Sequence, residues 1–91
     1  MPKYLIERTV PGATQMNPAE LQGIAAKSNT VLREMGPEIQ WVQSYVVRDR
    51  LCCVYNSESE ELILEHARRG GFPCDDIRQV TALIDPVTGE D

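Results

Sequence analysis

The residues best suited to chemistry in this chain are one imidazole, three thiols and scattered carboxylates. The histidine is His66, and the cysteines are Cys52, Cys53 and Cys74. Adjacent cysteines do not have a metal-binding spacing, so a metal site would have to assemble from separate elements. A carboxylate, a thiolate and an imidazole together suit a borderline divalent ion such as nickel or zinc. The candidate ligands are Glu7, Cys53 and His66, with Tyr45 or Gln43 nearby.

His66 also has a plainer interpretation, because it stands near the end of a predicted helix. A lone histidine there is more often a hydrogen-bonded structural residue or a partner of the helix dipole. It is followed by an arginine pair and a glycine pair, Arg68 to Gly71. The glycines would end the helix and the arginines would compensate its negative end. Alternatively, Arg69 at this chain reversal would bind an anion or dock against a partner subunit.

Enzyme signatures are missing from the sequence. It has no phosphate-binding glycine loop, no nucleophile elbow and no two-histidine zinc motif. Whether the protein is an enzyme therefore stays open. Three cysteines, two of them adjacent, make a poor disulfide framework. We expect reduced thiols in a cytoplasmic protein.

The charge distribution argues against two classes of partner. Nine basic residues against fourteen acidic ones give a net charge of −5, and the longest basic run is Arg68-Arg69. General nucleic-acid binding and adhesion to an anionic membrane both need clustered positive charge. The N-terminus has no signal-peptide core, and no apolar run approaches the roughly 20 residues of a membrane helix. We therefore expect neither nucleic-acid nor membrane partners.

Two helices and four strands are predicted. Asn17-Pro18-Ala19-Glu20 combines an N-cap residue, a first-turn proline and an acid at the third position, and Gly36-Pro37 ends the helix that follows. Ser57-Glu58-Ser59-Glu60 begins a second helix, at about 58–69, which Gly70-Gly71 ends. The predicted β-rich runs are 3–10, 40–47, 51–56 and 77–84.

The element order predicts one α+β domain of ferredoxin-like β-α-β-β-α-β type spanning residues 1–91. Its four-stranded antiparallel sheet would carry both helices on one face, with an acidic, flexible tail at 86–91. The other face would be left open, and a chain this short gains stability from oligomerisation. We expect two sheets to pair in a homodimer and close a barrel.

Strand alternation predicts which side chains face the interior of that barrel, and places Cys52 under the helices instead. The predicted interior residues are Glu7, Trp41, Gln43, Tyr45, Cys53 and Tyr55. Two interpretations of this interior remain open. It is either a packed dimer interface with satisfied polar groups, or a cavity for a metal or a small molecule.

Over residues 2–87, the sequence resembles a family of small bacterial proteins known as nickel-binding or nickel-responsive proteins. The most specific part of the resemblance is the run Glu65-His66-Ala67-Arg68-Arg69-Gly70-Gly71-Phe72-Pro73. It is supported by Pro2-Lys3-Tyr4, Ile6-Glu7-Arg8, Pro11-Gly12, Ile39-Gln40-Trp41-Val42, Ser44-Tyr45-Val46, Cys53-Val54-Tyr55 and Ile84-Asp85-Pro86. The resemblance implies a ferredoxin-like fold, a homodimer closed through its sheets, and nickel binding.

One departure from the family bears on the metal. We expect a histidine in the family where this chain has Gln43, and glutamine is a poor ligand for a borderline ion. The residues carried over as metal ligands are Glu7, Tyr45, Cys53 and His66. Those expected around a cavity are Trp41, Gln43, Tyr55 and Arg69. The hypotheses are a homodimer that holds nickel or another divalent transition metal, a barrel that binds or converts a small molecule, and a module that binds another protein.

Overall fold

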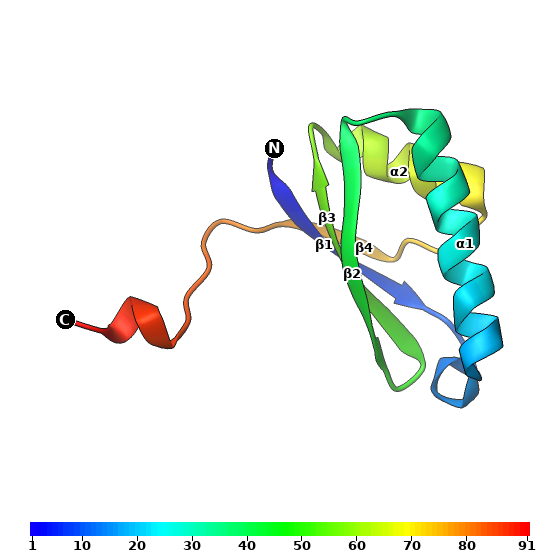
Figure 1. Cartoon of the computed structure of the whole chain (residues 1–91), viewed down its shortest axis with the longest axis horizontal. Coiled ribbons are helices and arrows are strands. Elements are labelled where there is room, and N and C mark those ends of the chain that lie inside the picture. Colours follow the sequence, from blue (N-terminus) through cyan, green and yellow to red (C-terminus); the bar gives the residue numbers. More distant parts are fainter.

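Two helices cover one face of a four-stranded antiparallel sheet in the computed structural model, which describes residues 1–91 (Figure 1). The strands have the order β2-β3-β1-β4, so the predicted ferredoxin-like fold is confirmed. The elements are β1 (Lys3–Thr9), α1 (Pro18–Met35), β2 (Ile39–Val47), β3 (Arg50–Ser57), α2 (Glu60–Gly70) and β4 (Asp76–Gln79), with 3-10 turns at Ala13–Gln15 and Pro86–Gly89.

Both helices end at the predicted signals, and α1 also begins at its predicted signal. At the start of α1, Asn17 and Glu20 form a capping box, in which each side chain accepts a hydrogen bond from the backbone N–H of the other. Ser59 caps α2 by accepting from the backbone N–H of Leu62, so this helix begins later than predicted. Gly71 ends α2 in the left-handed conformation, at φ 68°, which a residue without Cβ adopts at little cost.

The last strand is shorter than predicted. β4 ends at Gln79, whereas the sequence suggested a strand to residue 84. The reason is its partner: β1 begins at Lys3, whose carbonyl accepts the last bond of this ladder from Val80 N–H at 2.8 Å. The rest of the chain runs away from the sheet on the side opposite the helices (Figure 1). This segment, residues 81–91, is called the tail below.

A β-bulge divides β2 into two halves. Trp41 pairs with Tyr55 and Gln43 pairs with Val54, the neighbouring residue of β3, so Val42 is an extra residue without a partner. Because directly opposed residues share a face of the sheet, Trp41 lies on the helix side. Beyond the bulge, Gln43 and Tyr45 lie on the open side.

The hydrophobic core lies between the sheet and the helices. Its buried members are Tyr4, Ile6, Ile39, Cys53, Tyr55 and Ile63. Four of these, from β1 and β3, oppose one another in register: Tyr4 faces Tyr55, and Ile6 faces Cys53. No helix has the length and apolar character needed to cross a bilayer.

Candidate functional site

The sheet separates the four predicted metal ligands. Glu7 and Tyr45 lie on the open face, whereas Cys53 and His66 are buried between the sheet and the helices. A strand carries consecutive side chains to opposite faces, so these two pairs cannot meet within one protomer. The structure does not bring the expected set together.

The error in the prediction lies in the orientation of β3. Cys53 and Tyr55 were expected on the open face, but both are buried under the helices because they oppose the buried Ile6 and Tyr4. Cys52 is therefore the cysteine on the open face. The signal was present in the sequence, because Leu51, Cys53 and Tyr55 form a more apolar set than their alternates, which include Arg50 and Asn56. Trp41 was misplaced for another reason, the bulge at Val42.

The open face carries a row of polar side chains across three strands. Glu7 opposes Cys52 in β1 and β3, and Cys52 opposes Tyr45 in β2. Gln43 donates a hydrogen bond from its side-chain amide to the Tyr45 hydroxyl. Glu7 also forms an ion pair with Arg50 at 3.6 Å, between side chains that are 43% and 59% exposed. These groups are accessible to an ion or to another protein chain.

Nickel does not fit the donors of one protomer alone. Nowhere in the chain do three or more His, Cys, Asp or Glu side chains cluster so that they could hold a metal. The open face supplies one carboxylate and one thiol, Glu7 and Cys52, which are suitable donors for a borderline ion. The nearby phenol and amide are weaker donors. A complete coordination sphere would need side chains from a second chain.

His66 is fully buried in the interior. Its Nε2 lies 3.2 Å from Ser28 Oγ, and its ring packs between those of Tyr55 and Phe72, both with centroids at 5.4 Å. Burial, with a smaller effect from the charge of Arg8, lowers the pKa of His66 to about 4. The imidazole is therefore neutral at pH 7 and shielded from solvent, as a structural histidine would be.

Arg69 is exposed on α2 and does not line the cavity described below. Its Nε donates to Glu65 at 2.7 Å, and Arg68 donates to the same carboxylate at 2.6 Å. The hydrogen bonds from Arg68 and Arg69 lower the pKa of Glu65 to about 2. Both arginines lie in the last turn, where positive charge compensates the helix dipole.

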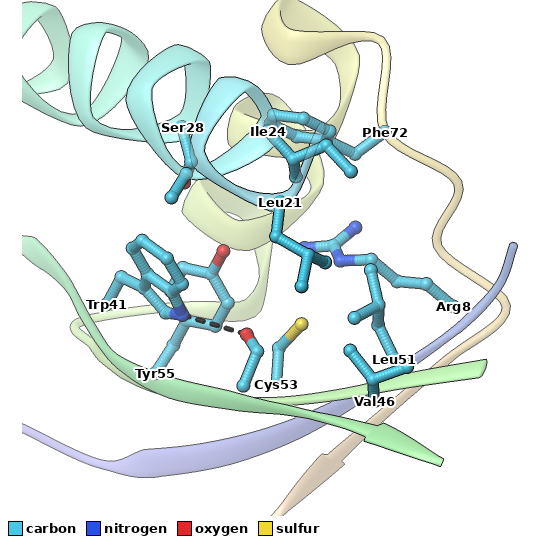
Figure 2. A pocket seen from close by; sticks show the side chains of 12 residues that line it. Arg8, Leu21, Ile24, Ser28, Trp41, Val46, Leu51, Cys53, Tyr55 and Phe72 are labelled. Carbon is cyan, nitrogen blue, oxygen red and sulfur yellow. Dashed lines mark hydrogen bonds between the residues drawn. The ribbon is translucent and has the colours of Figure 1, made fainter. Parts of the chain in front are cut away.

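A cavity of about 260 Å³ lies between α1 and the sheet (Figure 2). It is on the face of the sheet opposite the Glu7–Cys52 row. Of the residues predicted around a cavity, Trp41 and Tyr55 line it, but Gln43 and Arg69 do not. The other residues that line the cavity come from α1, the sheet and the loop after α2. They are Arg8, Leu21, Ile24, Ala25, Ser28, Ser44, Val46, Leu51, Cys53 and Phe72.

Phe72 reaches this cavity because the chain folds back after α2. Its backbone N–H donates to the Ala67 carbonyl at 2.9 Å, and its ring lies directly against Gly70. A Cβ atom at Gly70 would stand 2.1 Å from the Phe72 ring, so only glycine permits this position. The glycine that was expected only to end the helix therefore also shapes the cavity wall.

Arg8 is the functional candidate that sequence reasoning missed. Only 3% of it is exposed, and Figure 2 shows its guanidinium pointing into the cavity. Nη1 donates to the Pro73 carbonyl, and the guanidinium carbon lies 5.6 Å from the Phe72 ring centroid. Nη2 is buried without a hydrogen-bond partner. The available signal was that Arg8 shares a strand face with Tyr4 and Ile6, which form part of the core.

Comparison with known proteins supports the resemblance noted in the sequence. Residues 4–80 match the model of a family described as nickel responsive protein SCO4226-like. The chain belongs to this family. The SCO4226-like match covers both helices, all four strands and the Glu7–Cys52 row.

A solved member of the SCO4226-like group shows the same fold. The crystal structure of SCO4226 from Streptomyces coelicolor A3(2) superposes with a TM-score of 0.75, covering 90% of this chain and 99% of that one. The two sequences are 14% identical, so the likeness establishes the shared architecture alone. No curated protein matches the sequence.

Proposed function

We propose that this protein is a homodimer that binds nickel, or a similar divalent transition metal, on the open face of its sheet. The observation that carries the proposal is the cross-strand pair of Glu7 and Cys52, a carboxylate and a thiol side by side on an uncovered surface. The name of the family, nickel responsive, supports this choice of ion.

A second copy of the chain is the partner that would complete the site. It would contribute the same two side chains, so a site on a two-fold axis would hold two carboxylates and two thiolates. Such a mixed set suits a borderline ion such as nickel. Of the ligands expected from the sequence, Glu7 is retained, and Tyr45 lies beside it. Cys52 takes the place of Cys53 and His66, which are buried on the other face of the sheet.

Exposed apolar groups support the homodimer. On the open face, Leu5 is 47% exposed, and both Tyr45 and Val47 are 53% exposed. Contiguous apolar surface on a small domain marks an interaction site. A chain of 91 residues also buries a modest fraction of its surface alone, so pairing through the sheet would add to a thin core.

In this proposal the protein holds the metal without turnover. Binding would require deprotonation of Cys52, so affinity should rise with pH. Arg50 competes for the Glu7 carboxylate through their ion pair.

The proposal is tested by nickel titration of chelator-treated protein, with light scattering to give the oligomeric state. We expect saturable binding by a dimer. Removing a side chain that only hydrogen-bonds to a metal ligand typically lowers metal affinity roughly 10- to 100-fold. We expect Glu7→Gln and Cys52→Ser, which remove the ligands themselves, each to lower nickel affinity by at least that factor. The matched controls are Glu34→Gln on α1 and Cys74→Ser after α2, which make the same chemical changes away from the open face and should bind normally.

Two results would contradict the proposal. One is equal nickel binding by the wild type and both open-face variants, which would place the metal elsewhere. The other is a monomer without nickel affinity, which would favour an open face that docks against a different protein.

A further inference from the structure

We propose that the cavity beneath α1 is a second binding site, whose ligand is a small molecule with an apolar body and a carboxylate. Arg8 would hold the carboxylate. This inference does not depend on the metal proposal, because the cavity and the Glu7–Cys52 row lie on opposite faces of the sheet.

The first argument is that Arg8 is a buried cation without an anion. The four ion pairs of the structure involve Arg50, Arg68, Arg69 and Arg78, and none includes Arg8. A guanidinium stays charged in proteins, and burying an unpaired charge is costly. The Pro73 carbonyl and the Phe72 ring satisfy part of this group, but Nη2 remains free. An anion that accepts a hydrogen bond from Nη2 would pair the charge of the guanidinium. Carboxylates commonly bind arginine in this way, through two parallel hydrogen bonds.

A second donor lies beside the first. Burial raises the pKa of Tyr55, and the neighbouring positive charge of Arg8 lowers it in part. The phenol therefore stays protonated at pH 7 and can donate its hydrogen. Figure 2 shows the Tyr55 hydroxyl and the Arg8 guanidinium on the same side of the cavity, beneath α1. Two donors suit the two oxygens of a carboxylate.

The walls select the rest of the ligand. Apart from Arg8, they are mostly apolar, and their apolar residues include Leu21, Ile24, Trp41, Val46, Leu51 and Phe72. Such walls favour an alkyl chain or an aromatic ring by removing its surface from water. A phosphate carries about 1.5 to 2 negative charges at pH 7, so a single buried cation in an apolar setting suits a carboxylate better.

The size of the cavity limits the ligand to a small one. At about 260 Å³ it exceeds the cavity of about 150 Å³ that accepts benzene, and it approaches the lower end of ligand pockets, about 300 Å³. Leu21 and Val46 line it and are 37% and 41% exposed, so they mark the side from which a ligand would enter. Octanoate and phenylacetate are suitable probes.

The test compares acids with their uncharged amides on chelator-treated protein by calorimetry and thermal unfolding. We expect octanoate and phenylacetate to bind at least tenfold more tightly than octanamide and phenylacetamide, because hydrogen bonds to a charged group are the stronger ones. Arg8→Gln should abolish this preference, whereas Arg33→Gln, the same change on the exposed side of α1, should retain it. Circular dichroism checks that each variant is folded.

Two further variants keep the test decisive if Arg8→Gln does not fold. Tyr55→Phe removes one donor and should weaken acid binding severalfold. Ala25→Leu fills the cavity without touching a polar group and should abolish binding of both acids and amides. The proposal is overturned if amides bind as well as acids, if inorganic phosphate or chloride gives the same stabilisation, or if no acid binds at millimolar concentration.

Discussion

His66 Nε2 lies 3.2 Å from Ser28 Oγ, in a contact that joins α2 to α1 inside the protein. Both residues are buried, and the other ring nitrogen of His66 has no partner. The imidazole therefore supports the packing of the two helices only in its neutral form, because a buried imidazolium would leave a proton and a charge without an acceptor. We therefore expect the domain to be sensitive to acid.

Stability should fall in mildly acidic solution. The pKa of His66 is lowered to about 4 in the folded protein, mainly by burial, against about 6.5 in an unfolded chain. Between these values the unfolded state binds more protons, so the free energy of unfolding decreases as pH falls from about 6.5 to about 4. We expect a loss of roughly 3 kcal/mol at most.

Urea unfolding between pH 7 and pH 4 measures this loss, and His66→Gln, which cannot titrate, should show a much flatter profile. The pKa of Glu65 is lowered from 4.5 to about 2, so its own contribution is lost below about pH 4.5 and overlaps with the window of His66 only at the acid end of that window. Parallel profiles for the wild type and His66→Gln would refute the assignment.

Gly70→Ala should destabilise the protein, because the new Cβ would stand 2.1 Å from the Phe72 ring. The ring would have to leave its place against α2, at a cost of about 1–3 kcal/mol typical of overpacking. The control is Gly23→Ala in α1, where a Cβ meets nothing within 4 Å. That change should stabilise by about 0.5–1 kcal/mol, since alanine is the better helix former. Equal effects on urea unfolding would argue against a special role for Gly70.

Arg50→Gln should strengthen nickel binding if Glu7 is a ligand. The substitution releases the Glu7 carboxylate from an ion pair at 3.6 Å. Exposed pairs of this kind are worth up to about 1 kcal/mol, so affinity should rise by no more than about fivefold. Calorimetric titration with nickel, alongside Arg33→Gln as a charge-matched control, measures the effect. Weaker binding by Arg50→Gln than by the control would show that the arginine supports the site.

The tail should contribute to the proposed dimer. Leu83, Ile84 and Val87 are 72%, 83% and 67% exposed, and the tail leaves the sheet on its open side (Figure 1). Replacing all three with serine should raise the dimer dissociation constant about tenfold or more, because they would no longer bury apolar surface against the partner. Analytical ultracentrifugation compares this variant with the wild type. An unchanged constant would leave the sheet face as the sole contact.

The fold was predictable because its signals are local. The Asn17 cap, Gly71 and the element order specify two helices and a split βαβ arrangement, and the structure confirms them. The face of each side chain was less predictable, because one residue changes it. The bulge at Val42 follows from tertiary pairing with β3 and has no local signal in the sequence. The role of Arg8 was not predictable, because its lack of an ion-pair partner depends on where every carboxylate lies in the fold.

Consecutive residues give the two faces of the sheet a mechanical connection. Glu7 and Arg8 are neighbours in β1, and Cys52 and Cys53 are neighbours in β3, with one member of each pair on either face. A ligand that binds on one face and displaces a strand therefore also moves the neighbouring side chain on the other face, because the two residues share a peptide bond. Thermodynamic reciprocity then requires that any effect of metal on acid affinity be matched by an equal effect of acid on metal affinity.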